Sequence, residues 1–269
     1  MTMAATATLR TLLLASALVA MPGAACANGW PQPRGEGRVI SSLIYSESPR
    51  GFDGRGNVVD IDEYRQFQLY LNGEYGLTDD LTLLLTPSFR SIEVENQPER
   101  DATGLQFLDV GARYRVAGRG NTVVSVQAKT RIPLETFRDT LGQVSIQGVE
   151  LDLRGQVGHG FTMAGLNSFA IAEAGYTFRG DDPPNEFDLD LTLGARVAPR
   201  VMVIGNLYNT FSDGRGRNGF PSYRYHNLLL SGVYDVTDTV ALQLGVLATI
   251  DGKNALRERG LVAGLWVRF

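Results

Sequence analysis

The chain has 269 residues, of which 43% are hydrophobic and 20% charged, and its formal net charge is -4. This length suits one large domain or two small ones, and the absence of a basic excess argues against nucleic acid as a partner. After the N-terminus no apolar run approaches the roughly 20 residues of a membrane helix. If the mature chain spans a membrane, it must therefore do so with β-strands.

The first 27 residues have the features of a signal peptide. Arg10 precedes a short apolar core at residues 12–20, and residues 25–27 (Ala-Cys-Ala) form an A-x-A cleavage site before Asn28. The alternative, lipidation of Cys26, lacks the leucine that such a site favours three residues earlier. We expect a cleaved signal peptide at 1–27 and a single mature domain at 28–269.

Cys26 is the only cysteine, so a mature chain that begins at Asn28 has none. This excludes disulfides and cysteine-bound metals in the mature chain, and we expect neither a metal nor a cofactor. A chain without cysteine also suits a protein that crosses the oxidising periplasm unfolded.

Connections of two lengths alternate along the mature chain. The short ones recur about every 40 residues, a period that a solenoid or a propeller would share. Short turns on one side and longer loops on the other are typical of an outer-membrane barrel, with the turns in the periplasm. We expect short turns at 78–80, 118–120, 158–160, 199–200 and 237–238, and longer segments near 47–63, 93–103, 133–145, 180–186, 212–222 and 252–259.

Between these connections the sequence alternates apolar and polar residues, most clearly at 64–76, 105–116, 122–132, 149–157, 187–197 and 240–250. Alternation predicts strands with one apolar face, but a soluble barrel or sandwich would show it too. Strands of about 10 to 13 residues favour tilted membrane strands. Tyr75, Tyr114, Tyr234 and Phe269 lie beside short turns on the apolar face, as in an aromatic girdle at a lipid interface. We predict an all-β fold, an antiparallel up-and-down transmembrane β-barrel of about 12 strands.

The last ten residues, Gly260–Phe269, alternate in the same way and end on an aromatic residue. Such an ending resembles the signal that the barrel assembly machinery reads, with Trp266 and Phe269 as its residues. The expected location is the cell outer membrane, and the expected partners are that machinery, outer-membrane lipid and lipopolysaccharide. The Gly- and Arg-rich loop at 213–222 is a candidate contact for lipopolysaccharide phosphates.

In a lipid-embedded barrel the polar faces of the strands point inwards. The predicted lumen-lining residues are Gln68, Glu74, Arg90, Asp109, Arg113, Gln127, Lys129, Arg131, Glu150, Asp152, Arg154, Glu173, Asp188, Asp190, Arg196 and Gln243. Folding the chain about a turn near residue 119 sets Asp109 opposite Lys129.

Two interpretations of these charges stay open. Opposite charges that face each other across an open lumen would orient a polar solute. Alternatively the charges pair and fill a narrow barrel, since twelve strands lie between the packed eight-stranded barrels and the open porins.

Enzymatic chemistry finds little support, and no catalytic residue is predicted. His159 is expected in a periplasmic turn and His226 on the lipid-facing side, so neither is placed to activate a serine, and no G-x-S-x-G element occurs. Two pairs of acids, each on one strand, are expected to be pore or salt-bridge groups rather than a glycosidase pair: Glu150 with Asp152, and Asp188 with Asp190.

Three stretches resemble a family of outer-membrane barrels grouped as phenol-degradation-pathway transporters: Gly76–Leu83, Leu108–Tyr114 and Asp235–Phe269. The resemblance implies uptake or export of small, often aromatic molecules. The function expected from the sequence is a passive outer-membrane channel for small molecules, aromatic or hydrophobic ones included. The alternative is a closed structural or surface-interaction barrel without transport, and an outer-membrane hydrolase is the third hypothesis.

Overall fold

The computed structural model of the protein describes residues 29–269, apart from residues 137, 138 and 140. The predicted signal peptide at 1–27 and its cleavage site lie outside the described residues. Within the described ranges no helix is long and apolar enough to cross a membrane. The one short helix there is the 3-10 turn η1 (Pro98–Arg100).

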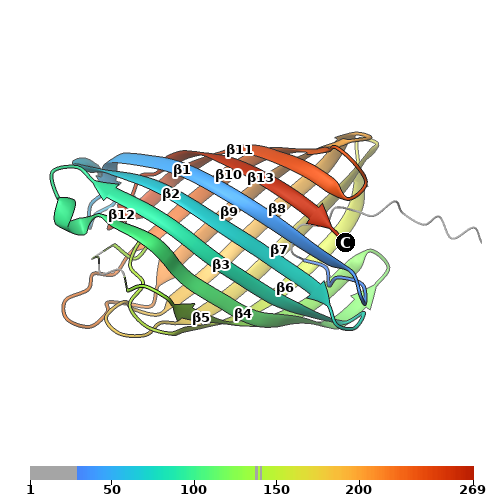
Figure 1. Ribbon diagram of the computed structural model, residues 1–269, viewed down its shortest axis with the longest axis horizontal. Helices are drawn as coiled ribbons and strands as arrows, with labels where there is room; N and C mark the ends of the chain where they lie inside the picture. The colour runs from blue at the N-terminus through green and yellow to red at the C-terminus, as the bar shows by residue number, and fades with distance from the viewer. Residues whose placement is uncertain (1–28, 137–138, 140) are drawn as a thin grey trace, which may run out of the picture.

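Twelve long antiparallel strands in the described chain close into a single barrel (Figure 1). The long strands are β1 (Gly37–Phe52), β2 (Val58–Gly76), β3 (Leu81–Val94), β4 (Ala102–Arg119), β5 (Thr122–Pro133), β6 (Glu150–Met163), β7 (Leu166–Phe178), β8 (Glu186–Ala198), β9 (Val201–Ser212), β10 (Arg224–Asp235), β11 (Val240–Lys253) and β13 (Arg259–Arg268). Consecutive long strands pair, β13 pairs with β1, and the two-residue β12 (Ala255–Leu256) extends that seam. The predicted antiparallel barrel of about 12 strands is confirmed.

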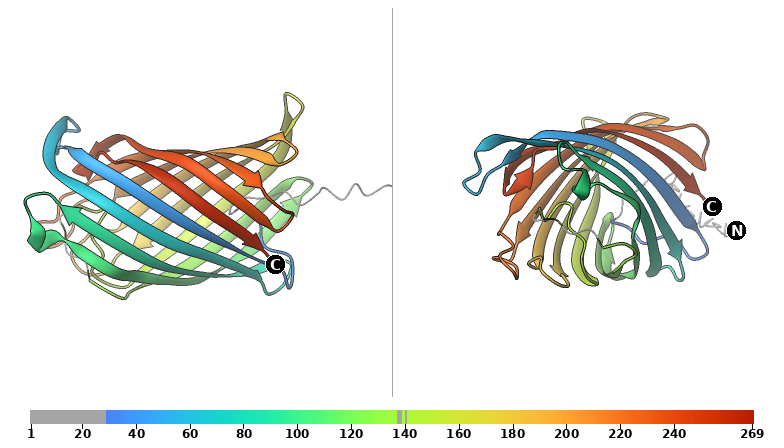
Figure 2. Two further views of the ribbon diagram at one scale, coloured as in Figure 1. Left: turned by 45° about the horizontal axis from the view of Figure 1, so that its top comes forward. Right: turned by 60° about the vertical axis from the view of Figure 1, so that its left-hand side comes forward.

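The connections sort by length to the two ends of the barrel (Figures 1 and 2). The short turns gather with the C-terminus at one end, which we call the turn end. The longer loops gather at the other, which we call the loop end. The short turns occupy 77–80, 120–121, 164–165, 199–200 and 236–239, and the loops occupy 53–57, 95–101, 134–149, 179–185, 213–223 and 254–258.

The turn predicted at 158–160 is wrong. Strand β6 runs through it to Met163, and the chain reverses at Ala164 and Gly165, which both have positive φ. Two successive positive φ angles are typical of a type I′ hairpin turn, where Asn-Gly or Gly-Gly is usual, so the alanine concealed it. His159 is consequently a strand residue, exposed and hydrogen-bonded through Nδ1 to the Thr122 hydroxyl at 2.8 Å.

The first predicted loop, at 47–63, is also largely wrong. β1 continues to Phe52 and β2 starts at Val58, so the hairpin tip is only 53–57. The Asp53 carboxylate accepts the backbone N–H groups of Arg55 and Asn57, which fixes that tip. Residues 58–60 are all exposed. Because both faces of this extension meet solvent, its sequence has no reason to alternate.

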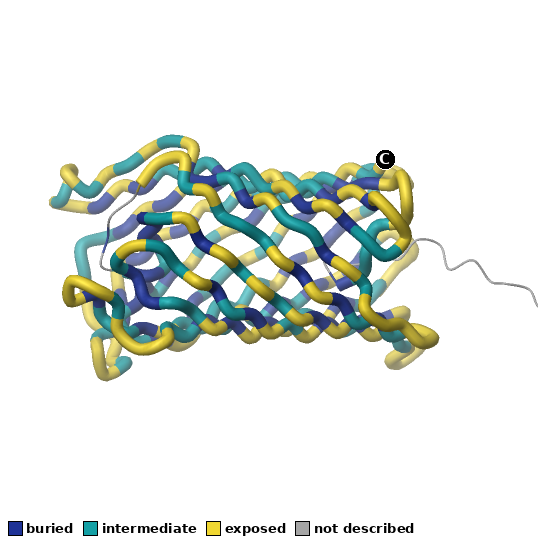
Figure 3. The backbone as a smooth tube through the Cα atoms, turned by 90° about the horizontal axis from the view of Figure 1, so that it is seen from below, coloured by how far each residue is buried: buried dark blue, intermediate teal, exposed yellow. Residues whose placement is uncertain are grey.

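Along the strands of the barrel wall, exposed and buried residues alternate (Figure 3). Outward side chains such as Leu71, Val126 and Leu191 are exposed, whereas their inward neighbours on the strands, such as Gln127 and Asp190, are buried. This arrangement is the inverse of a soluble barrel. An apolar exterior around a polar interior is what a strand-built membrane protein requires.

The C-terminus closes the seam of the barrel. Gly37 and Phe269 exchange two backbone hydrogen bonds, with N to O distances of 2.7 and 3.0 Å. The Phe269 ring lies over Gly37, where a Cβ would come within 2.5 Å of it, and the ring is 64% exposed on the outer side.

Deleting Phe269, or Phe269→Ala, should lower the yield of inserted barrel, because the seam loses its last backbone pair and the proposed assembly signal. Heat-modifiable migration on gels and protease sensitivity of the periplasmic fraction measure this. Val236→Ala, an exposed apolar truncation at the same end, is the control. Wild-type yield of heat-modifiable barrel after the deletion would contradict the expectation.

The topology gives a second expectation, that the loop end faces the cell surface. Single cysteines at Asn57 and Asn218, in two loops, should react with an impermeant maleimide on intact cells. A cysteine at Asp238, in a short turn, should react only after the outer membrane is permeabilised. Labelling at Asp238 without labelling at the loops would reverse the orientation.

Candidate functional site: the barrel interior

The turn end is filled by an apolar cluster and by the start of the described chain. The cluster comprises Phe169, Ile171, Met202, Ile204, Val233, Ala241 and Trp266. Trp30 packs against it, edge-on to Phe169 with 6.2 Å between ring centroids. Gln32 donates from its backbone to Thr82 Oγ1 at 2.8 Å and from Nε2 to Glu74 at 2.7 Å. Residues 29–34, which we call the N-terminal segment, therefore enter the barrel at the turn end, with residues 29–32 inside it and Pro33 and Arg34 exposed at its rim.

Glu74 is the ionic centre of this end. Its two oxygens accept from Arg38 at 2.7 Å and from Arg113 at 3.2 Å, and all three side chains are buried. Arg113 also donates to Gln127 at 3.1 Å and to the backbone oxygen of Trp30 at 3.4 Å. Buried charges are stable only when they are paired and hydrogen-bonded. The same network holds the N-terminal segment in place.

At the loop end, the connection between β5 and β6 folds back into the barrel. Residues 141–147, which we call the inner loop, include the fully buried Val144, which packs in a second apolar cluster with Tyr64, Ile92, Val94 and Leu256. Gln143 and Leu256 exchange two hydrogen bonds, at 2.5 and 3.5 Å. The inner loop thus narrows the mouth that Figure 2 (right) views obliquely.

A polar cavity of about 280 Å³ lies between these two ends. Six of its lining side chains are carboxylates and three are basic, an excess of three negative charges. The lining comprises Asp109, Lys129, Arg131, Glu150, Asp152, Arg154, Thr177, Glu186, Asp188, Asp190, Tyr208, Thr210, Tyr225 and Asn227. Acidic walls with little access to bulk water raise the local concentration of cations.

Arg154 organises the acidic side of the cavity. Its guanidinium binds three carboxylates, with N to O distances of 2.8 Å to Asp152, 3.0 Å to Asp188 and 2.7 Å to Asp190. Asp188 also accepts the Thr210 hydroxyl at 2.8 Å. One guanidinium among three carboxylates leaves two negative charges on this side.

The prediction that Asp109 lies directly opposite Lys129 is wrong. The hairpin turns at 120–121, and a bulge at 115–117 shifts the register, so that Asp109 pairs with Arg131. Arg131 donates to both carboxylate oxygens of Asp109, at 2.8 and 2.9 Å, whereas Lys129 Nζ stays 3.9 Å away. The bidentate pair is the stronger contact.

Arg179 links the cavity to the inner loop. It donates to Glu150 at 2.8 Å, to Glu186 at 3.0 Å and to the backbone oxygen of Ser145 at 2.5 Å. Burial, and then the neighbouring Glu186 carboxylate, raises the pKa of Tyr223 in the adjoining loop. The Tyr223 hydroxyl therefore stays protonated and donates to Glu186 at 2.5 Å.

The structure places all the predicted lumen residues on inward positions, but it divides them along the barrel. Eight line the central cavity: Asp109, Lys129, Arg131, Glu150, Asp152, Arg154, Asp188 and Asp190. Glu74, Arg113, Gln127, Arg196 and Gln243 lie towards the turn end, Gln68 and Arg90 towards the loop end, and Glu173 between cavity and turn end. The charges therefore form separate clusters rather than one continuous ladder.

The two predicted assembly residues have different surroundings. Trp266 is buried and inward, donates from Nε1 to Gln243 at 2.9 Å, and has the Arg38 guanidinium 5.6 Å from its ring centroid. Phe269 is outward, at the seam. In this structure Trp266 is thus part of the turn-end interior.

Sequence reasoning missed several interior features. Glu186, Tyr208 and Thr210 lie on the inward faces of β8 and β9. Extending the alternation at 187–197 by one residue would have found Glu186, whereas Tyr208 and Thr210 lie on a strand whose faces were not assigned from the sequence. The inner loop carried a weaker signal, the apolar Val144 within a stretch of Gly, Gln and Ser. The N-terminal segment was marked by Trp30, a bulky aromatic residue beside the predicted cleavage site.

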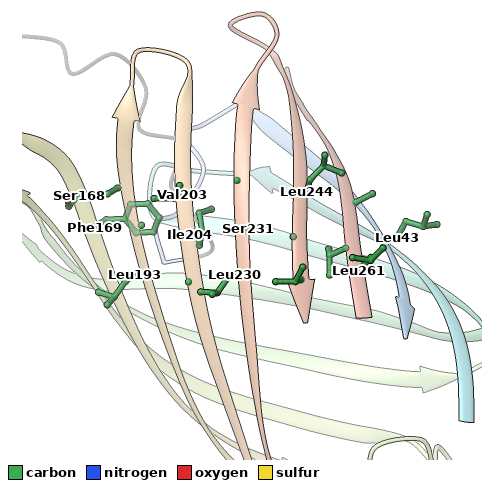
Figure 4. Close-up of a pocket in the computed structure, with 18 of the residues that line it drawn as sticks. Leu43, Ser168, Phe169, Leu193, Val203, Ile204, Leu230, Ser231, Leu244 and Leu261 are labelled. Atoms are coloured by element: carbon green, nitrogen blue, oxygen red, sulfur yellow. The ribbon is translucent and has the colours of Figure 1, made fainter. Parts of the chain in front are cut away.

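A separate hollow of about 1150 Å³ lies on the outer wall, across β6 to β11, β13 and β1 (Figure 4). Exposed side chains such as Leu193, Leu244 and Leu261 rise around the outward Gly205 and Gly232. Among the described residues no charged side chain lines it. This surface is almost wholly apolar, with Tyr45, Ser168 and Ser231 as its polar members, and it fits hydrocarbon. The candidate site is therefore the interior cavity, where charged side chains gather.

Comparison with known proteins bears on the fold. No family model and no curated protein matches the chain. The chain is similar to the solved COG4313 outer membrane channel from Pseudomonas putida F1, with a TM-score of 0.69 and 15% identity over 92% of this chain and 100% of that one. It is less similar to the NanC porin (TM-score 0.48, 9% identity, 84% and 98% covered) and to the KdgM porin in complex with disordered oligogalacturonate (0.47, 10%, 85% and 99%). The first likeness shows that the fold is the closed antiparallel barrel of an outer-membrane protein.

Proposed function

We propose that the protein is an outer-membrane channel through which small polar or charged solutes, cations above all, diffuse passively. The observation that carries this proposal is the acidic cavity enclosed by a barrel whose exterior is apolar. A polar interior supplies the contacts that replace a solute's hydration. The fold shared with a solved outer membrane channel supports the same function.

The cavity argues for hydrophilic rather than hydrophobic cargo. An apolar molecule would have to displace water from six carboxylates and three basic groups without satisfying any of them. Tyr208 and Tyr225 are the aromatic residues of the wall, and their rings suit a cationic group as well as an aromatic one. We therefore propose a charged or polar solute in place of the aromatic cargo that the family resemblance implies.

Passage through this barrel requires its ends to open. The N-terminal segment is the part best suited to move, because residues 29–34 belong to no long strand and can withdraw without breaking the barrel. The inner loop is held more firmly, by its apolar cluster and by hydrogen bonds from β3, from β12 and from Arg179 in the loop after β7. We propose that the N-terminal segment limits the conductance.

The same features favour one other function, a closed structural barrel. Both ends are filled, and most cavity carboxylates are already paired with basic groups. In that case the charges stabilise the barrel and no solute passes. Electrical recording separates the two functions.

Ion selectivity tests the channel. In a salt gradient across a planar bilayer, the refolded wild type should pass cations in preference to anions. Asp188→Asn with Asp190→Asn lowers the cavity's excess from three negative charges to one, so its reversal potential should shift towards anions. Lys129→Gln with Arg131→Gln should shift it the other way, and Glu93→Gln, on the outer side, should leave it unchanged. Identical reversal potentials in all four proteins would contradict a pathway through the cavity.

A further inference from the structure

We propose that the interior carries a binding site for an organic cation whose head group is rich in N–H donors, an ammonium or a guanidinium, centred on Gln156 and Glu173. This inference rests on the proposed channel function, since it names the class of solute that the channel takes. It is carried by a row of five inward side chains, three of which have buried oxygens that accept no hydrogen bond.

The row runs across five neighbouring strands. Ser125 on β5 pairs with Gln156 on β6, which pairs with Glu173 on β7, then Asp190 on β8 and Tyr208 on β9. We call this the acceptor row. Directly opposed residues on one face of a sheet have Cβ atoms roughly 4.5–5.5 Å apart. A single small molecule can therefore contact two or three members at once.

Three consecutive members of the row have buried oxygens without partners. Ser125 Oγ, Gln156 Oε1 and Glu173 Oε1 receive no hydrogen bond from any described residue, and Gln156 is only 3% exposed. Gln156 uses its amide nitrogen towards Gln127 at 3.5 Å, which leaves the oxygen free to accept. Buried acceptors without donors are rare because each costs free energy. Three adjacent ones form a surface that a donor-rich ligand completes.

The charges around the row select a cation. Glu173 forms no ion pair with a described residue, and its neighbour in the row, Asp190, is engaged by Arg154. The nearby cavity already has three more carboxylates than basic groups, so an anion is repelled. An ammonium or guanidinium at Glu173 would supply the missing charge and the missing donors together.

The aromatic end of the row adds a second contact. The Tyr208 side chain is 37% exposed within the barrel and makes no hydrogen bond to a described residue. Its ring face can attract a cation, and its hydroxyl can bind a polar group of the ligand. Because the acceptors are neutral oxygens as well as carboxylates, the site prefers N–H donors to a quaternary ammonium of equal charge.

Calorimetric titration of the refolded barrel in detergent tests the site with two probes, n-butylammonium and tetramethylammonium chloride. Butylammonium should bind the wild type, and tetramethylammonium should bind at least about tenfold more weakly, because it has no N–H group. Glu173→Gln should weaken butylammonium about ten- to a hundredfold, as expected for the loss of a hydrogen bond to a charged group. Gln156→Leu should weaken it less, and Glu93→Gln not at all.

Heat-modifiable migration shows that each variant is folded before it is titrated. Equal affinity for the two probes, undiminished affinity in Glu173→Gln, or no binding to the wild type would overturn the site. Binding without bilayer conductance would support the site and reject the channel. Conductance without butylammonium binding would support the channel and reject the site. The two experiments therefore test the two proposals independently.

Discussion

Trp30→Ala should raise the single-channel conductance of the refolded protein several-fold. The Trp30 ring anchors the N-terminal segment in the apolar cluster at the turn end, edge-on to Phe169 and against Gly158, where a Cβ would lie 3.0 Å from it. Without the ring, the segment keeps only polar links to the wall, which are the hydrogen bonds of Gln32, the bond from Arg113 to the backbone oxygen of residue 30, and the bond from the Arg34 N–H to Asp79. A terminal segment that has lost its apolar anchor opens more readily. Its release would unblock the turn end.

Bilayer recording of the variant and of two controls measures the effect. Arg34→Gln, an exposed change in the same segment, should conduct like the wild type. Trp30→Phe, which keeps an apolar ring, should give an intermediate conductance. The thermal stability of Trp30→Ala should fall little, because no long strand is involved. Wild-type conductance in Trp30→Ala would remove the N-terminal segment as the limiting element.

Arg154→Met should have the largest effect on stability of any change in the interior. It strands Asp152, Asp188 and Asp190 in the barrel with no guanidinium between them, and all four side chains are largely buried. Removing one partner from a buried ion pair costs about 3–5 kcal/mol. The variant should unfold at a lower temperature. Where it folds, it should prefer cations more strongly, because the loss of one guanidinium makes the net charge of the cavity more negative by one unit.

A combined variant separates charge from packing. Asp188→Asn and Asp190→Asn added to Arg154→Met should recover most of the lost thermal stability, because two of the three stranded charges disappear together with their partner. The third, Asp152, still lies opposite Lys129 on β5. Thermal unfolding followed by heat-modifiable migration compares the three proteins. If the combined variant were no more stable than Arg154→Met, the guanidinium would act through its packing and not through the three carboxylates.

The strands were predictable from the sequence because a membrane barrel imposes period two on every residue that crosses the lipid. Alternation placed both faces of 64–76 and 240–250 as the structure has them. Outside the part of the strands that crosses the lipid, the sequence has no such period, and the strand ends and turns could not be predicted from it. Residues 58–60 are strand but exposed on both faces, and the Ala164–Gly165 turn uses a residue that rarely adopts positive φ. The bulge at 115–117 left no mark on the pattern, yet it changed the partner of Asp109.

The candidate site was predictable only as a set of inward polar residues. Periodicity shows which way Asp188 or Lys129 points, but not that one lies beside Arg154 and the other opposite Gly111. Those contacts depend on strand register. The N-terminal segment and the inner loop have no periodicity, and their positions follow from apolar side chains that find partners across the barrel, as Val144 does.

Conductance of the wild type tests the central claim most directly. Protein refolded in detergent and shown to be a heat-modifiable barrel is added to a planar bilayer at neutral pH. A channel through the acidic cavity predicts discrete conductance steps and, in a salt gradient, a reversal potential of the sign that marks cation preference. A correctly folded barrel that inserts into the bilayer and gives no steps would contradict the channel and leave the closed structural barrel as the function.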